Sequence, residues 1–225
     1  MSIASEISRI QEELKPFSTQ LIVVTKTRSI AELIETHATG IRNFGENRVQ
    51  EMVEKQSQLP ADILWHQIGH LQTNKVKYIA PFVHLIHSVD SLKLLKEINA
   101  QAKKNNRTID CLLQMYIAQE ESKFGLDKHE LLALLADPSF AELQNIRILG
   151  LMGMASFTSD QTQIAREFKS LQGIFQALQN EKIGVSTGIV DWKELSMGMS
   201  GDYLLAAEHG STLVRVGSAI FGERK

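Results

Sequence analysis

The residue with the clearest chemical potential is a lysine that directly follows an apolar run. Lys26 comes immediately after LIVVT at positions 21–25, a short, β-branched sequence that predicts a buried parallel strand. A lysine at such a place loses part of its hydration, which favours the neutral amine. A neutral amine can attack a carbonyl and form a Schiff base. From spacing alone, a solvent-facing lysine in a connecting loop is the alternative.

Two turns of small residues near the end of the chain are candidates for holding a phosphate. Ser200 and Gly201 follow one apolar run and precede a predicted helix, and Gly217 and Ser218 follow the next run, LVRV. Glycine-rich turns and helix N-termini offer free backbone N–H groups to anions. Each turn alone could simply reverse the chain, but two of them after consecutive late strands favour a phosphate-bearing ligand.

An arginine interrupts the last apolar run. Arg215 lies between Val214 and Val216, and the alternation of a strand places it on the opposite face from both valines. We therefore expect Arg215 to point into the interior of the fold, where its guanidinium needs a partner. That partner is either a ligand or an acid on a neighbouring strand.

Further polar residues follow two earlier apolar runs. Asn47 comes after IRNFG, and His66, Gln67 and His70 lie in or after ILWHQIG, so all four are candidates for the same end of the sheet. The two histidines belong to a predicted strand and turn, not to one helix, so they do not form the HExxH zinc arrangement. We expect no metal site. Four methionines near strand ends are expected to be packing residues: Met152, Met154, Met197 and Met199.

The elements that must position these side chains alternate along the chain. Short apolar runs lie at 21–25, 41–45, 63–69, 83–90, 110–116, 146–154, 194–200 and 212–222. Predicted helices lie between them at 29–37, 46–58, 73–80, 91–104, 128–136, 161–179 and 203–209, after one leading helix. Such alternation predicts an α/β fold with a parallel sheet. In a chain of 225 residues it favours a single-domain (β/α)8 TIM-type barrel over 1–225 with an extra N-terminal helix. A doubly wound open sheet is the alternative.

Composition limits the class of protein further. The net charge of -2 and the pI of about 6.4 give no reason to expect nucleic acid or an anionic membrane as a partner. The sequence shows neither a transmembrane run nor the apolar core of a signal peptide. The one cysteine, Cys111, lies in an apolar run and fits a reducing compartment. We expect a cytoplasmic protein.

Several motifs taken together resemble the pyridoxal phosphate homeostasis protein family. They are VTKT, FGENRVQE, WHQIGHLQTNK, IHSVDS, ESKFG, GLM, LSMGMSGD and GSTLVRVGSAIFGER, and they extend from about Leu21 to Arg224. The fold is also similar to the barrel domain of alanine racemase. The resemblance implies pyridoxal 5′-phosphate as the cofactor and seven binding residues: Lys26 through a Schiff base, Arg215 at the pyridine nitrogen, Asn47 beside the ring, and Ser200, Gly201, Gly217 and Ser218 at the phosphate.

Two considerations bear on whether such a protein is an enzyme or a carrier. An arginine at the pyridine nitrogen does not usefully give up its proton, so the ring would stay unprotonated and would be a poor electron sink. In related barrel enzymes a second acid/base comes from an added domain, and this chain ends at Lys225, just after the last predicted strand. We expect a monomeric, non-enzymatic carrier or buffer that supplies apo-enzymes with the cofactor. A low-activity racemase or lyase, and a regulatory protein that senses the cofactor, are the alternatives.

Overall fold

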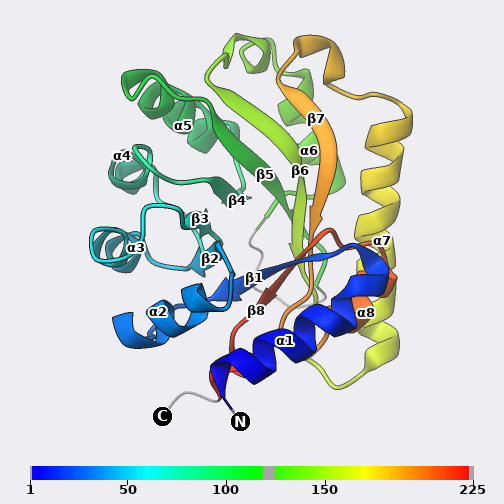
Figure 1. The fold of residues 1–225 in the computed structure, drawn as a ribbon. Helices are drawn as coiled ribbons and strands as arrows, with labels where there is room; N and C mark the ends of the chain where they lie inside the picture. Colours follow the sequence, from blue (N-terminus) through cyan, green and yellow to red (C-terminus); the bar gives the residue numbers. More distant parts are fainter. Residues whose placement is uncertain (1, 119–124, 223–225) are drawn as a thin grey trace.

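The parallel strands of the protein close into a barrel. The computed structural model describes residues 2–118 and 125–222, so most of the ESKFG motif lies outside the described residues. Within them, eight strands follow one another around the barrel in sequence order, and β1 pairs with both β2 and β8. The helices lie around the outside of the strands (Figure 1). The closed pairing confirms the predicted barrel and rules out the doubly wound open sheet.

The strands agree closely with the apolar runs of the sequence. They are β1 (Gln20–Val24), β2 (Asn43–Glu46), β3 (Leu64–Gln67), β4 (Leu85–Val89), β5 (Ile109–Tyr116), β6 (Ile146–Met154), β7 (Val190–Ser196) and β8 (Leu213–Val216). The largest differences from the predicted boundaries occur in β7 and β8. β7 begins at Val190, four positions before the predicted 194, where buried Val190 and Trp192 alternate with exposed residues. The run predicted as one strand over 212–222 ends at Val216 and is followed by a helical turn.

The helices begin and end near the predicted positions. They are α1 (Ile3–Leu14), α2 (Ile30–Ala38), α3 (Val49–Gln56), α4 (Val76–Ile79), α5 (Leu92–Lys104), α6 (Lys128–Ala136), α7 (Gln161–Asn180), α8 (Tyr203–Glu208) and α9 (Ser218–Phe221). The predicted helix 73–80 is a 3-10 turn, Thr73–Lys75, followed by the single turn of α4. The expected N-terminal helix is α1, which packs against β1, α2, α8 and α9.

Local capping fixes where α2 starts, and so fixes the length of the turn that carries Lys26. Ser29 Oγ accepts from the backbone N–H of Glu32, and the Glu32 carboxylate accepts from the backbone N–H of Ser29. This reciprocal capping box satisfies two N–H groups that a helix N-terminus leaves unpaired. The turn between β1 and α2 is therefore held to the few residues from Thr25 to Ser29.

Apolar side chains pack in an outer layer between strands and helices and in a smaller cluster inside the barrel. Among the described residues the inner cluster comprises Ile22, Leu85, Leu112, Leu149, Met152 and Leu213. Val214 and Val216 belong to the outer layer, while Leu213 faces inward. This alternation confirms that Arg215 points into the barrel, where only 4% of the residue is exposed. Buried polar side chains share that interior with the apolar cluster.

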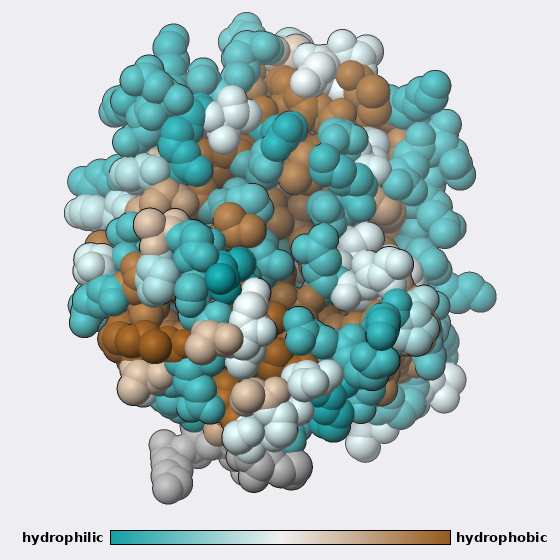
Figure 2. Space-filling model, viewed as in Figure 1, coloured by the Kyte–Doolittle hydropathy of each residue, from teal (hydrophilic) through white to brown (hydrophobic). Residues whose placement is uncertain are grey.

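The outer surface carries mostly polar residues. In Figure 2, hydrophilic residues cover most of the visible face, with hydrophobic residues showing between them. None of the helices in the described ranges is long and apolar enough to cross a membrane.

Candidate functional site

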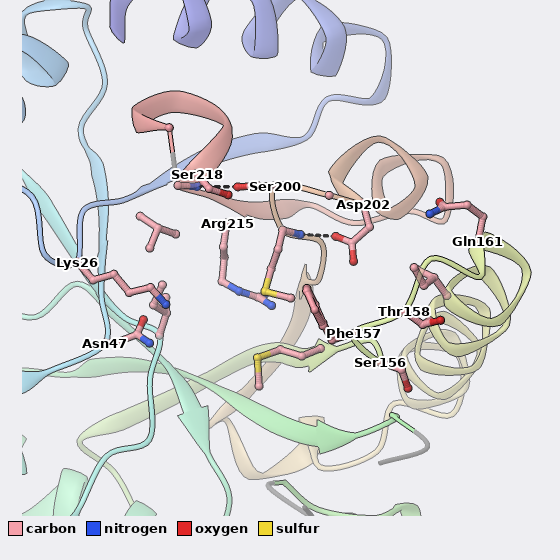
Figure 3. A pocket seen from close by; sticks show the side chains of 18 of the residues that line it. Lys26, Asn47, Ser156, Phe157, Thr158, Gln161, Ser200, Asp202, Arg215 and Ser218 are labelled. Atoms are coloured by element: carbon pink, nitrogen blue, oxygen red, sulfur yellow. Dashed lines mark hydrogen bonds between the residues drawn. The ribbon is translucent and has the colours of Figure 1, made fainter. Parts of the chain in front are cut away.

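A cavity of about 460 Å³ lies at the carboxyl ends of the strands (Figure 3). This volume lies within the range of small-molecule and cofactor sites, roughly 300–1,000 Å³. All seven site residues expected from the sequence line the cavity: Lys26, Asn47, Ser200, Gly201, Arg215, Gly217 and Ser218. They come from β8 and from the segments after β1, β2, β7 and β8. Parallel strands bring these carboxyl ends to one face of a barrel, which explains how such distant positions meet.

Lys26 is half-buried, and the backbone on both sides of it is held in place. Lys55 Nζ donates to the carbonyl oxygen of Thr25 (2.7 Å). The backbone N–H of Thr27 donates to the Glu51 carboxylate. Thr27 has a φ of 63°, in the left-handed region that a threonine rarely adopts. The turn therefore depends on its hydrogen bonds to α3, and these direct the side chain of Lys26 into the cavity (Figure 3).

The hydrogen bonds to this turn belong to a buried cluster of ions. Lys55 Nζ lies 2.8 Å from Glu46 Oε1 and 2.6 Å from Glu51 Oε1. Glu46 is fully buried, also accepts from Thr25 Oγ1 at 2.5 Å, and leaves its second carboxylate oxygen without a partner. Burial raises the pKa of Glu46, although Lys55 opposes that change. No feature of the sequence alone connected this cluster with Lys26.

Arg215 brings a buried positive charge to the floor of the cavity. Its Nη1 donates to Ser196 Oγ (2.6 Å), and its Nη2 donates to the carbonyl oxygen of Gly153 (3.0 Å). Within the described residues, no carboxylate lies within 4.0 Å of the guanidinium, so the expected alternative of a salt bridge to a neighbouring strand is not observed. Burial lowers the pKa of Arg215 to about 10, and Asp202 opposes that change. Arg215 therefore stays charged at neutral pH.

The two turns of small residues lie side by side at one end of the cavity (Figure 3). Ser200 Oγ accepts from the backbone N–H groups of Gly217 (3.1 Å) and Ala219 (3.3 Å), which ties one turn to the other. A Cβ on Gly217 would lie 3.1 Å from Val24 Cβ and 3.2 Å from the Val24 carbonyl oxygen. A larger residue at position 217 would therefore be accommodated only if β1 and the turn moved apart by a few tenths of an ångström. The Ser200 hydroxyl thus accepts from two backbone N–H groups of the second turn, the kind of donor that also suits an anion.

Only one of the four polar residues predicted to reach this end of the sheet lines the cavity. Asn47 does, but His66 and Gln67 are buried side chains of β3 that lie within the barrel wall and interior. Gln67 instead donates to the carbonyl oxygens of Asn47 and Gly69, both at 3.0 Å. His70 comes after the turn at Gly69 and lines a separate, open groove beside Asp90.

The prediction for the methionines was half correct. Met152 and Met197 are buried packing residues, whereas Met154 and Met199 are more than a third exposed and line the cavity. Each lies two positions after the buried methionine of the same segment, Met154 at the last residue of β6 and Met199 after the end of β7. Further lining residues were missed, and their position after a strand end was the available signal: Ser156, Phe157, Thr158, Gln161 and Asp202. The described residues contain no cluster of three or more His, Cys, Asp or Glu side chains suited to a metal ion.

The fold and the site together define the class of this protein, a closed parallel barrel with a half-buried lysine and a buried arginine in a cavity at the carboxyl ends of its strands. Residues 1–225 match the family described as alanine racemase, N-terminal domain. The chain is 39% identical over 207 residues to the pyridoxal phosphate homeostasis protein of Aquifex aeolicus (strain VF5), covering 92% of this chain and 87% of that one. The Homo sapiens protein of the same name is 36% identical over 232 residues, covering 99% and 82%.

A solved structure agrees with these relatives. PipY of Synechococcus elongatus PCC7942, with PLP bound, superposes with a TM-score of 0.87 at 35% identity, covering 98% of this chain and 100% of that one. The chain therefore belongs to the pyridoxal phosphate homeostasis protein family. These curated relatives are named for homeostasis of the cofactor and not for an enzymatic reaction.

Proposed function

We propose that this chain binds pyridoxal 5′-phosphate in the cavity and serves the homeostasis of that cofactor as a carrier or buffer. The observation that carries the proposal is that Lys26 and Arg215 both point into one cavity whose edge is formed by the two small-residue turns (Figure 3). Pyridoxal phosphate, when bound, supplies an aldehyde that condenses with amines and a ring whose electron-accepting strength depends on its nitrogen.

The residues of the cavity take complementary parts in this proposal. Lys26 provides the amine for a Schiff base, and the turns Ser200–Gly201 and Gly217–Ser218 provide hydrogen-bond donors for the phosphate. Asn47 lies beside Lys26 in Figure 3, on the side from which it would contact the ring. Arg215 would supply a charged donor to the ring nitrogen. The residues present therefore fit a ligand that has an aldehyde, a ring nitrogen and a phosphate.

Arg215 is also the reason to propose a carrier and not an enzyme. Its guanidinium remains protonated at neutral pH, so it would donate a hydrogen bond to the ring nitrogen of a bound cofactor and would favour the unprotonated form of that nitrogen. A cationic donor in this position gives a weaker electron sink than the carboxylate that many enzymes place there. The cavity is thus suited to holding the cofactor more than to activating a bound amino acid.

Borohydride trapping tests the binding proposal. The purified protein loaded with pyridoxal phosphate should absorb in the visible range, and reduction should attach the cofactor to the peptide that contains Lys26. Lys26→Ala should lose the label, whereas Lys77→Ala, which removes an exposed lysine of α4, should keep it. A label on another lysine of the Lys26→Ala protein at the wild-type yield would disprove the assignment.

Isotope exchange and transfer distinguish a carrier from an enzyme. The loaded protein is incubated with each L-amino acid in deuterated buffer, and separately with an apo-transaminase. We expect transfer of the cofactor to the transaminase without Cα exchange at rates typical of enzymes. Exchange at such rates would instead favour the racemase or lyase.

We further propose that the whole chain acts as one domain, as a monomer in the cytoplasm, with apo-enzymes that use pyridoxal phosphate as its acceptors. The buried thiol of Cys111, whose pKa burial raises, is unreactive, as a protein of a reducing compartment allows. Light scattering during gel filtration should give a mass near 25.2 kDa. Twice that mass would contradict the monomer.

A further inference from the structure

A continuous line of hydrogen bonds runs through the barrel interior below Arg215. Arg215 Nη1 lies 2.6 Å from Ser196 Oγ. Ser196 Oγ lies 2.9 Å from His87 Nδ1, and His87 Nε2 lies 3.0 Å from His66 Nδ1. His66 Nε2 lies 3.2 Å from Asn43 Oδ1. The line therefore joins β8, β7, β4, β3 and β2, and it connects the cavity floor with the amino-terminal end of the barrel.

All hydrogen bonds of this line have the same donor-to-acceptor direction. An arginine can only donate, and Asn43 presents a carbonyl oxygen, which can only accept, because its Nδ2 faces Gln20 Oε1 at 3.5 Å. Between these fixed ends, the Ser196 hydroxyl donates to His87 Nδ1. His87 and His66 then each carry their hydrogen on Nε2 and donate away from the cavity. Every donor in the line points from Arg215 toward Asn43.

Both histidines are neutral, as this arrangement requires. Burial, together with the nearby His84, lowers the pKa of His66 to about 3. Burial also places the pKa of His87 well below its usual value, and His66, Arg215 and His84 add to the effect. His84 packs against His66 with ring centroids 5.4 Å apart, and burial, Arg107 and Arg147 lower its own pKa, while Asp110 opposes that change.

An aligned line of neutral dipoles stabilises a buried cation without neutralising it. The serine oxygen and both Nδ1 atoms turn their negative ends toward the guanidinium, and hydrogen bonds in series polarise one another in a low-dielectric interior. Among the described residues no carboxylate forms a salt bridge with Arg215, and Asp202 acts on it only through the electrostatic field. The line therefore stabilises the buried guanidinium in place of a carboxylate partner. Because it carries no negative charge, the positive charge of Arg215 can still act on a ligand in the cavity.

We infer that Ser196, His87 and His66 are positioning residues that hold Arg215 as a charged donor toward the ring nitrogen of the cofactor. The inference rests on the proposed function, because it requires Arg215 to face that ring. The three side chains touch no part of the cavity themselves, since only Arg215 of this line belongs to the lining.

The test compares Ser196→Ala and His87→Leu with a matched control, His84→Leu. His84 occupies the same region but takes no part in the line. Because a hydrogen bond contributes about 0.5–1.5 kcal/mol, each of the first two variants should lose about threefold to tenfold in affinity for pyridoxal phosphate. The visible absorbance of the bound cofactor and its pH dependence should also shift in both, and should stay unchanged in His84→Leu. A merely structural role would lower the melting temperature without moving the absorbance.

Nitrogen NMR of the histidine rings in the wild-type protein tests the direction of the line without any substitution. Two neutral rings with hydrogen on Nε2 are expected for His66 and His87 at neutral pH. A charged ring, or hydrogen on Nδ1 of His87, would overturn the inference. This measurement decides the matter even if a variant fails to fold.

Arg215→Ala separates failure of the inference from failure of the proposed function. If Arg215→Ala alters the absorbance while Ser196→Ala and His87→Leu leave it unchanged, the line does not position Arg215 but the ring contact stands. If Arg215→Ala leaves the absorbance unchanged, Arg215 does not face the ring. The ring contact in the proposed function and the positioning role of Ser196, His87 and His66 are then both wrong. Labelling of Lys26 would still report binding of the cofactor independently.

Discussion

At the scale of single residues, the cavity combines the lysine proposed for covalent attachment with a charge that cannot easily be lost. Lys26 is half-buried at the mouth, and Arg215 is buried at the floor with a pKa of about 10. Burying a cation without a carboxylate partner is costly. Such a cost is tolerated where the charge serves a ligand, which makes Arg215 the residue whose substitution is most informative.

Arg215→Glu should change the electronic state of the bound cofactor. A glutamate would accept a hydrogen bond from the ring nitrogen and favour its protonated form, and it would also place a negative charge opposite Ser196 Oγ. We expect a shifted visible absorbance with a new pH response and weaker binding, without efficient turnover of amino acids. Spectra recorded across a pH series check this. An unchanged spectrum and pH response would show that Arg215 does not touch the ring.

Gly217→Val should release the cofactor while the fold persists. The new side chain would meet Val24 at about 3.1 Å and would push the turn at Gly217 and Ser218 away from β1. Charge-assisted hydrogen bonds to a phosphate contribute about 1.5–3 kcal/mol each, so losing several should weaken binding by orders of magnitude. Fluorescence titration measures the affinity, and pyridoxal without the phosphate should bind the wild-type protein similarly weakly.

Gly173→Ala provides the control for that substitution. Gly173 lies in α7 with nothing within 4 Å of an added Cβ. Replacing a helical glycine with alanine stabilises a helix by about 0.8–1.0 kcal/mol. The variant should therefore bind the cofactor normally and unfold at a slightly higher temperature. Equal loss of affinity in both glycine variants would mean that position 217 has no special part in binding.

At the scale of elements, α3 controls the turn that presents Lys26. Lys55 and Glu51 of α3 hold the backbone at Thr25 and Thr27, so the first helix after β2 fixes the segment after β1. The contact crosses from one β/α unit to the next. The orientation of Lys26 therefore depends on residues that touch no ligand.

Lys55→Met should destabilise the protein and weaken the covalent attachment at Lys26. Removing one partner of a buried ion pair leaves an uncompensated charge on Glu46, at a cost of about 3–5 kcal/mol. Urea unfolding and the yield of borohydride labelling measure the two effects. Lys15→Met, which breaks an exposed pair with Glu12, should cost only about 0–1 kcal/mol. Equal stability of the two variants would contradict the importance of the buried cluster.

At the scale of the whole molecule, the barrel interior makes folding stability depend on pH. His66 and His87 are neutral in the folded protein, with pKa values lowered by burial, but they take up protons near pH 6.5 once unfolded. The unfolded state thus binds more protons over the range below about pH 6.5 and down to about pH 3 for His66. The stability that the two neutral histidines contribute is therefore fully present above the pKa of unfolded histidine, about 6.5, and it is lost as the pH falls through this window.

Urea unfolding from about pH 7 to about pH 4.5 should therefore show stability falling with pH, by up to about 1.4 kcal/mol per pH unit for each histidine. His87→Leu should lower the free energy of unfolding at about pH 7. It should also reduce the dependence of that free energy on pH by up to about 1.4 kcal/mol per pH unit, which corresponds to one proton. His84→Leu, which removes a partly exposed ring, should change the slope less. A slope unchanged in His87→Leu would show that His87 is not kept neutral by the fold.

The sequence by itself determined those features that depend on residues close together in the chain. Strand alternation placed Arg215 inward and its two valine neighbours outward, as observed. Apolar runs followed by small or polar residues marked the strand ends, which is why Lys26 and both small-residue turns were found where the cavity lies. The periods of strands and helices are local properties, so one sequence suffices to read them.

The tertiary structure decided everything that depends on contacts between distant residues. In the tertiary structure β1 pairs with β8, and Asn47 lines the cavity. His66 lies in the barrel interior, whereas His70 lines a separate groove. It also joined His87 to Ser196, which are 109 positions apart, and Lys55 to the turn at Lys26. Local periodicity fixes the face on which a side chain lies, but its partner depends on how the elements pack, and only the closed barrel specifies that packing.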